Sequence, residues 1–585
     1  MKKFRFGKNG AKLLGGAILL YVCLFALTAA LTQKITYSYT KILIFAALLL
    51  AANAAVYSSK KRYAAAIGLV LAAWSTYLFI PWSGNEVFLP KGTAAFLAWI
   101  TGTALASLLA ASVWPGKRTR AAVLLLLVGG LQLSLLFAWG YFLTTGSAVH
   151  AETILACMQT NGAEAKEYIS DYLTGGVWLA LAGYIVYLAA VWKAAESLTV
   201  RKGSRWMTVC IAVLFAANLG LAVKSMRNMF TEPVYQVQTY MEQYCVFEEN
   251  RERRKEGIQK LAVAKNENMN GVYVLVIGES QNKDHMSAYG YERDTTPWLR
   301  HMKDTGKILL FDRAYSAHTH TTLVLTYALT AKNQYNKVPL EKAVSLLEAA
   351  EAAGFETVWL SNQVQYGAWD TPISVIAAEA NQQKWLNRNV GEVLDTNVYD
   401  EELVNQFDHI RYTENMLIVL HLMGNHGSYT ARYPKEYNRY SEAGTIQAYD
   451  NSILYNDAVM EKLYERIQRI PNIKGLIYIA DHADAVDQGL AHDASTFVYP
   501  MTHIPFYIWL SDTYRREDPA LAERLAQAQH KPFTNDLLFN AMLGIMHIDL
   551  PLMYEGKNDI TSMQYDDRIE RFTTLYGKRK LQYDK

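Results

Sequence analysis

The chain has 585 residues, 51% of them hydrophobic, and its 57 lysines and arginines against 54 aspartates and glutamates leave a formal net charge of +3. The basic residues form no continuous patch outside the short loops between apolar segments, so the charge does not support a nucleic-acid partner, and we exclude one. No cysteine follows Cys245, which excludes a fold held together by disulfides for the second half of the chain.

Residues 1–223 are predicted to form a transmembrane domain of about seven helices. A helix that spans a bilayer needs about 20 mostly apolar residues. Seven segments approach that length: 12–32, 41–57, 64–82, 93–114, 121–143, 174–192 and 207–223. Lysines and arginines precede the first segment and follow the second, the fourth and the sixth, which predicts that these loops are cytoplasmic. Everything after Val223 is then predicted to lie outside, in the periplasm or its equivalent.

The loop of residues 144–173 is predicted to lie on the same outer side. It carries apolar residues at helical spacing beside polar residues that include Thr160 and Glu164. One interpretation is an amphipathic helix that rests at the membrane surface. The other is that the loop also holds a lipid headgroup near the second half of the chain.

Residues 266–585 are predicted to form an α/β domain, connected to the membrane part by a linker at 224–265. Four apolar runs fit strands that are buried on both faces, as in a parallel sheet covered by helices: GVYVLVIGES, ETVWLSNQ, NMLIVLHLMGNH and GLIYIADH. Residues 340–353 and 446–469 show helical periodicity between these runs. The alternation of strands and helices predicts an α/β/α sandwich.

Each of the four runs ends in a polar group, and ligands of such sheets bind beyond the carboxyl ends of the strands. The groups are Glu279, Asn362, His426, and Asp481 with His482. Two carboxylates and an imidazole that meet in space make a zinc or manganese site. The alternative for the Asp-His pair is a structural hydrogen bond.

A nucleophile could come from AYSAHTHTTLVLTYALT, where helical periodicity begins after a group of threonines. A threonine hydroxyl is a poor nucleophile unless a metal ion or a base withdraws its proton. The sequence pattern leaves open which threonine this is: Thr319, Thr321, Thr322 or Thr326. The alternative is that the first three only cap the helix.

Four histidines are candidates for metal binding, phosphate contact or acid/base catalysis, with a purely structural role as the alternative. They are His318, His320, His426 and His492.

The stretch VLVIGESQNKDHMSAYGYERDTTPWL resembles the opening motif of the bacterial phosphoethanolamine transferases, which belong to the alkaline phosphatase/sulfatase superfamily. Similarity continues in the family's order through SAHTHTTLVLTYALT, VWLSNQ, HLMGNHGSYTARYP, AYDNSILYND, YIADHAD and NDLLF. The resemblance implies an N-terminal helical transmembrane bundle and an α/β/α sandwich ectodomain of the alkaline phosphatase/sulfatase type. It also implies a multi-pass protein of the inner membrane whose catalytic domain lies in the periplasm.

The resemblance assigns roles to several of the candidate residues. Glu279, Asp481 and His482 would be ligands of a catalytic zinc ion, with manganese as the alternative. The family's nucleophilic threonine falls on Thr321, which would complete the metal coordination.

The remaining assignments concern the substrate. His426 resembles the family's phosphate-contacting histidine, and His492 a histidine of the substrate side or of a second metal. Thr160 and Glu164 resemble residues of the headgroup-binding loop. We expect His318, His320 and Asn362 to contact the substrate as well.

The implied reaction moves phosphoethanolamine from phosphatidylethanolamine, through a phospho-threonine intermediate, to an envelope glycolipid or glycan such as lipopolysaccharide core, lipid A or a glucan, and releases diacylglycerol. Two alternatives share the fold: a phosphoglycerol transferase of the lipoteichoic-acid synthase type and an inactive membrane-bound protein. A sulfatase is disfavoured because no cysteine follows Cys245 to become its modified nucleophile.

The chain departs from the family pattern in three places. Asp481-His482-Ala483-Asp484 replaces Asp-His-Gly-Glu, Ala156 stands where an asparagine is expected, and the disulfides of the lipid A enzymes are absent. The first two differences bear on substrate handling, and the third favours acceptors other than lipid A.

Overall fold

A computed structural model describes residues 37–76, 80, 90–114, 116–146, 148–159, 175–200, 205–225, 232–261, 263–266, 269–365, 372–388, 398–440 and 444–584. The chain divides into two compact units, Met1–Leu155 with Ile169–Gln238 and Ala156–Tyr168 with Thr239–Lys585. Each unit has a hydrophobic core of its own.

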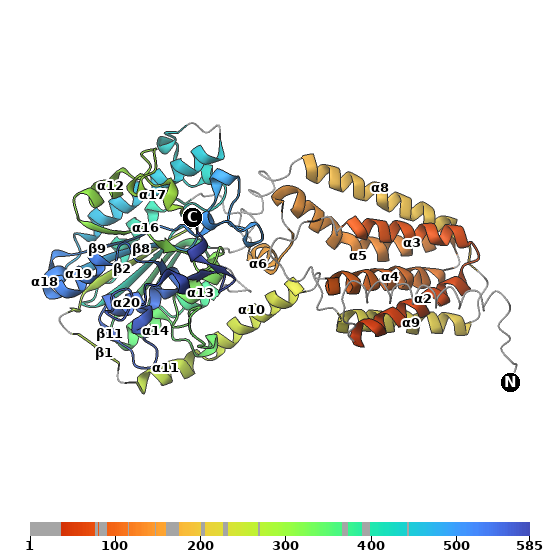
Figure 1. The fold of residues 1–585 in the computed structure, drawn as a ribbon, viewed down its shortest axis with the longest axis horizontal. Helices are drawn as coiled ribbons and strands as arrows, with labels where there is room; N and C mark the ends of the chain where they lie inside the picture. The colour runs from red at the N-terminus through yellow and green to blue at the C-terminus, as the bar shows by residue number, and fades with distance from the viewer. Residues whose placement is uncertain are drawn as a thin grey trace. The chain divides into compact units, whose positions relative to one another are not determined.

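The first unit is helical (Figure 1). Its helices are α2 (Tyr37–Val56), α3 (Lys60–Ser75), α4 (Pro90–Ser112), α5 (Lys117–Thr145), α8 (Gly175–Ser197) and α9 (Arg205–Ser225). Helix α6 (Ala151–Gln159) begins in the first unit, and its residues from Ala156 onward belong to the second. Six of the seven predicted apolar segments fall on α2, α3, α4, α5, α8 and α9, and the segment at 12–32 lies outside the described residues.

The described residues contain fewer clear membrane spans than the seven that the sequence predicts. Only α8 is long and apolar enough to cross a bilayer on its own in the part of the chain that the structure describes. A second span is present if the two halves of α5, which bend by 44°, count as one. The number of spans therefore stays a prediction.

The segment predicted as a linker contains two helices, α10 (Glu232–Glu249) and α11 (Arg251–Gln259). Phe247 of α10 belongs to a core cluster of the second unit. The guanidinium of Arg254, on α11, is buried and pairs with Glu348 at 3.0 Å and with Glu379 at 2.8 Å. These contacts attach α11 and the C-terminal part of α10 to the second unit.

A seven-stranded sheet forms the centre of the second unit, in the order β3-β9-β8-β2-β7-β5-β6. The four predicted runs become β2 (Val272–Gly278), β5 (Glu356–Gln365), β7 (Met416–His421) and β8 (Ile473–Ala480), and with β6 (Gln382–Arg388) they pair in parallel. The sequence pattern did not predict the antiparallel edge formed by β9 (Phe506–Leu510) and β3 (Ile308–Phe311).

Helices cover both faces of this sheet, which confirms the α/β/α arrangement (Figure 1). Successive side chains of a strand point to opposite faces, so Tyr273, Leu275 and Ile277 of β2 join one core cluster while Val272 and Val274 join the other. The first cluster packs beneath α13 (Thr321–Ala328), α14 (Leu346–Ala352), α15 (Pro372–Ala377), α18 (Asp512–Glu517), α19 (Pro519–Gln527) and α20 (Leu538–Ile545). The second packs beneath α12 (Pro297–Asp304), α16 (Glu401–Asn405) and α17 (Thr445–Ile467).

Three short strand pairs lie outside the central sheet. They join β1 (Ala264–Lys265) to β11 (Ile548–Asp549), β4 (Ala314–Tyr315) to β10 (Phe533–Thr534), and β12 (Thr573–Thr574) to β13 (Arg579–Lys580).

Candidate active site

The sheet brings two of the predicted metal-binding segments together because β2 and β8 are adjacent and parallel. Gly278 pairs with Ala480 at the carboxyl ends of these strands. Glu279 directly follows β2, and Asp481 directly follows β8. Residues some two hundred positions apart in the chain therefore leave the same edge of the sheet side by side.

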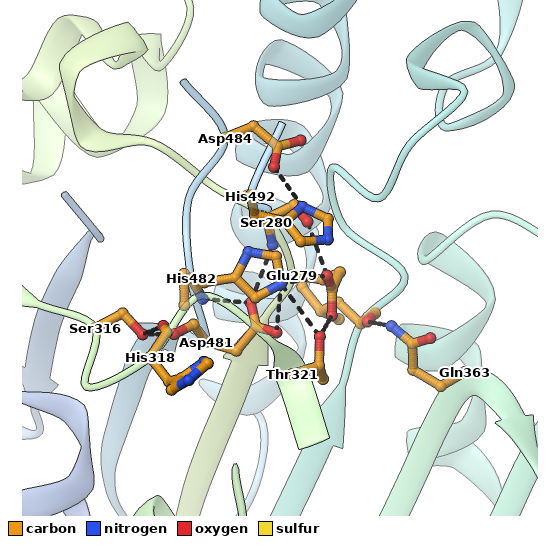
Figure 2. Close-up of polar contacts among 12 residues, drawn as sticks. Glu279, Ser280, Ser316, His318, Thr321, Gln363, Asp481, His482, Asp484 and His492 are labelled. Carbon is orange, nitrogen blue, oxygen red and sulfur yellow. Dashed lines mark hydrogen bonds and ion pairs between the residues drawn. The ribbon is translucent and has the colours of Figure 1, made fainter. Parts of the chain in front are cut away.

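Thr321 completes this cluster as the first residue of α13 (Figure 2). Its hydroxyl donates a hydrogen bond to Glu279 Oε2 at 3.0 Å and lies 3.2 Å from His482 Nε2. The hydroxyl of Thr319 is buried without a hydrogen-bond partner. Of the two threonines, the structure thus places Thr321 against the carboxylate and the imidazole.

The geometry of the cluster fits a divalent metal ion. Ligand atoms of Glu279, Asp481 and His482 lie within 4.8 Å of one another, and all three residues are buried. Asp481 Oδ2 has no hydrogen-bond partner. A buried carboxylate oxygen without a donor is costly, and a cation would satisfy it.

Burial shifts the pKa values of all three groups. Burial raises the pKa of Glu279. Burial, followed by the charge of Glu279, raises the pKa of Asp481 to about 7. Burial lowers the pKa of His482 to about 4, so its imidazole is neutral and able to act as a ligand.

A second group of possible ligands shares His482 with the first. Ligand atoms of His482, Asp484 and His492 lie within 4.8 Å of one another. Asp484 Oδ1 contacts His492 Nδ1 at 2.7 Å, and Asp484 Oδ2 accepts a hydrogen bond from Tyr429 at 2.7 Å. Burial disfavours the charged form of His492, but the charge and hydrogen bond of Asp484 outweigh burial and raise its pKa to about 9.

The structure brings the remaining histidines close to this centre. The rings of His318 and His320 lie 5.9 Å apart, and the ring of His320 lies 5.6 Å from that of His492. Burial, with the charges of Arg432, His492 and other neighbours, lowers the pKa of His426 to about 3. The ring of His320 therefore lies near the rings of both His318 and His492, and His426 is close enough to His482 and His492 for their charges to affect its pKa.

Asn362 is not brought into this cluster. Its side-chain amide donates to Asp400 at 2.8 Å, and Asp400 in turn accepts the backbone N–H groups of Met423 and Gly424. Gln363, the next residue of β5, instead donates to the carbonyl of Leu422 beside the site (Figure 2). Thr160 and Glu164 lie outside the described residues.

Several residues that the sequence pattern did not single out shape the site. Asn535, from the NDLLF run, donates its amide to the carbonyls of Ala480 and Asp481 and accepts the N–H of Ala317. Ser316 donates its hydroxyl to the carbonyl of Asp481 (Figure 2). Both fasten the loop before Thr321 to the end of β8, and the only signal in the sequence is that they lie inside the family-like motifs.

Known proteins resemble this chain over both units. A family model described as Sulfatase matches residues 272–548. The phosphoethanolamine transferase EptC of Escherichia coli K12 is 26% identical over 422 residues, which cover 65% of this chain and 72% of that protein. The phosphoethanolamine transferase CptA of Salmonella typhimurium is 26% identical over 527 residues, which cover 81% of this chain and 89% of that protein.

A solved structure shares the fold across most of the chain. It is that of an integral membrane protein, the lipooligosaccharide phosphoethanolamine transferase A of Neisseria meningitidis. The likeness covers 88% of this chain and 97% of that protein, at 19% identity and a TM-score of 0.55.

Proposed function

This chain belongs to the phosphoethanolamine transferases of the alkaline phosphatase/sulfatase superfamily, and we propose that it transfers phosphoethanolamine from phosphatidylethanolamine to an acceptor of the cell envelope. One observation carries the proposal: the hydroxyl of Thr321 lies within hydrogen-bond distance of both Glu279 and His482. A nucleophile and metal ligands thus meet at the edge of the sheet where such folds bind substrates.

Glu279, Asp481 and His482 are the residues that would hold the metal ion, which we propose to be zinc. Two carboxylates and one imidazole leave an open position, as catalytic zinc sites require. When bound there, the ion would lower the pKa of the Thr321 hydroxyl and offset negative charge on the phosphoryl oxygens.

The proposed reaction is a double displacement with Thr321 as the nucleophile. Its Oγ1 forms a bond to the phosphorus of phosphatidylethanolamine, and the bond from phosphorus to the glycerol oxygen breaks. Diacylglycerol leaves, and its glycerol oxygen takes up the proton that Thr321 loses. The oxygen of an acceptor hydroxyl then forms a bond to the phosphorus, the bond from phosphorus to Thr321 Oγ1 breaks, and the proton of the acceptor returns to Thr321.

The surrounding histidines are proposed to contact the transferred group. His426 and His492 would hold its phosphoryl oxygens, and His318 and His320 would contact the substrate beside them. Positioning and charge stabilisation dominate phosphoryl transfer. The role we propose for Asp484 is to orient the ring of His492 by its contact with the Nδ1 atom of that ring.

We place the protein in the inner membrane as a multi-pass protein, with residues 1–223 as the transmembrane domain, 224–265 as a linker and 266–585 as the catalytic domain in the periplasm. Thr160 and Glu164, in the loop at 144–173, are proposed to bind the ethanolamine headgroup. The acceptor is proposed to be an envelope glycolipid or glycan.

The test uses the purified full-length protein with phosphatidylethanolamine labelled in the headgroup. We expect release of diacylglycerol and a phosphoethanolamine adduct on Thr321, detected by mass spectrometry of peptides. Thr321→Val should abolish both, whereas Thr319→Val, two residues away and also a threonine, should retain the adduct.

Three results would contradict the proposal. A phosphoglycerol adduct, formed when phosphatidylglycerol is supplied, would identify the lipoteichoic-acid synthase reaction. An adduct that disappears in Thr319→Val but persists in Thr321→Val would show that Thr321 is not the nucleophile. No release of diacylglycerol from either lipid, with zinc bound, would identify an inactive protein of this fold.

A further inference from the structure

Ser280 has an unusual backbone conformation directly beside the candidate metal ligands. It follows Glu279, it is fully buried, and its φ is 54°. Residues with a Cβ atom rarely adopt this left-handed region, and when they do the conformation is often retained for function.

Every polar group of Ser280 makes a hydrogen bond, and two of these hydrogen bonds go to the candidate metal ligands. Its N–H donates to Asp481 Oδ1 at 3.0 Å, and its hydroxyl donates to Glu279 Oε1 at 2.8 Å. Its carbonyl accepts a hydrogen bond from the hydroxyl of Tyr449 at 2.7 Å. Figure 2 draws Ser280 with its two carboxylate partners, Glu279 and Asp481.

Tyr449 anchors this turn from α17. It is buried, and its hydroxyl also accepts the N–H of Asn282 at 2.8 Å. The carbonyl of residue 280 and the N–H of residue 282 therefore share one fixed partner. These two hydrogen bonds hold Ser280 in its left-handed conformation, and neither of them involves Glu279 or Asp481.

The consequence is that Ser280 holds one oxygen of each carboxylate and leaves the other oxygen outside its own hydrogen bonds. Glu279 Oε1 accepts from Ser280, while Oε2 accepts a hydrogen bond from the Thr321 hydroxyl at 3.0 Å. On Asp481, Oδ1 accepts from Ser280 and from the N–H of His482, while Oδ2 has no hydrogen-bond partner. Hydrogen bonds of this kind orient metal ligands and tune their affinity.

We propose that Ser280 is a positioning residue whose left-handed backbone and hydroxyl together orient Glu279 and Asp481 so that one oxygen of each is directed to a metal ion beside Thr321. The inference rests on the proposed function for the reaction that the site performs. It concerns the orientation of the two carboxylates, so it can be tested by zinc binding without measuring lipid cleavage.

The test titrates zinc into purified full-length protein after chelation and records thermal unfolding of the metal-free form. Ser280→Ala removes the hydroxyl and keeps the Cβ atom at positive φ, whereas Ser280→Gly removes both. Leu552→Ala and Leu552→Gly are the matched controls, because Leu552 also has a positive φ, of 71°, and is 88% exposed.

Both Ser280 variants should bind zinc about 10- to 100-fold more weakly than the wild type. Ser280→Gly should nonetheless unfold at a midpoint about 2 °C above that of Ser280→Ala, since glycine carries no Cβ strain. The two Leu552 variants should show a similar difference in midpoint and no change in zinc affinity. Tyr449→Phe should weaken zinc binding without removing any atom that contacts a ligand.

Wild-type zinc affinity in either Ser280 variant would overturn the inference, as would a loss of affinity that simply follows a loss of stability in the metal-free protein. Release of diacylglycerol is measured in parallel to separate the two proposals. If the wild type binds zinc, the Ser280 variants bind it weakly and no lipid is cleaved, the proposed function fails and the positioning role stands. If lipid is cleaved and both Ser280 variants bind zinc normally, only the positioning role fails.

Discussion

Gly424, in the loop after β7, packs closely against the backbone of Glu279 in the candidate metal site. Its φ is 53°, and a Cβ atom built on it would lie 2.8 Å from the carbonyl oxygen of Glu279, 2.9 Å from its nitrogen and 3.0 Å from its Cβ. Real Cβ atoms do not approach backbone this closely, and backbone cannot rotate away as a flexible side chain can. We therefore predict that Gly424→Ala displaces Glu279.

The expected cost has two parts. A Cβ atom at positive φ costs about 1–2 kcal/mol, and overpacking against fixed atoms adds about 1–3 kcal/mol. Gly306→Ala is the control, because Gly306 has a φ of 68° and a Cβ atom added to it would have no other atom within 4 Å. Both substitutions restrict the unfolded chain equally. The difference between their losses in free energy of unfolding therefore reports the collision with Glu279.

The assay is urea unfolding of the metal-free full-length protein, together with zinc titration. Gly424→Ala should lose about 1–3 kcal/mol more than Gly306→Ala and should also bind zinc more weakly, whereas Gly306→Ala should bind it as the wild type does. Equal losses in the two variants, with unchanged zinc affinity, would refute the packing argument.

Three further predictions concern the nucleophile, the metal and His503. Thr321→Val should reduce diacylglycerol release by roughly 10³-fold or more and leave the unfolding midpoint close to that of the wild type; retained activity would rule out this nucleophile. Chelation should abolish release and destabilise the protein by about 2.7 kcal/mol relative to a metal concentration 100 times the dissociation constant, and adding back zinc or manganese separately identifies the metal by which one restores turnover. The Nδ1 atom of His503 lies 2.5 Å from Asp284 Oδ2, and its Nε2 atom lies 2.8 Å from Asp584 Oδ2. Burial alone would lower the pKa of His503, but the two carboxylates raise it to about 9. Because the pKa of His503 in the folded protein exceeds the unfolded value of about 6.5, the ion pairs stabilise the protein fully below pH 6.5, and this stabilisation is lost as the pH rises through 9. His503→Gln should therefore lower the free energy of unfolding by about 1–3 kcal/mol at pH 6 and by much less at pH 10. A loss that does not change with pH would contradict the ion pairs.

The apolar runs and the polar residues that end them were readable from the sequence because both are local properties of a strand. Glu279, Asp481 and His482 could therefore be predicted as neighbours once adjacent parallel strands were assumed. The strands β3 and β9 were not predicted, because ILLF and FYIWL are runs of only four and five apolar residues, which periodicity alone does not assign to a strand. Asn362 and Gln363 show the limit at single-residue resolution: both are polar, and only the packed sheet decides that Asn362 turns to Asp400 while Gln363 lies beside the site.

Apolar periodicity and residue chemistry are local properties of the chain, and they were enough to predict alternating strands and helices in its second half, with metal-type side chains at strand ends. That the hydroxyl of Thr321, and not that of Thr319, contacts Glu279 is seen only in the folded protein. The same holds for the left-handed backbone of Ser280 and its hydrogen bonds to two carboxylates. These relations join groups up to about two hundred residues apart, and a hydrogen bond over such a separation exists only when the whole sheet has set the positions of both partners.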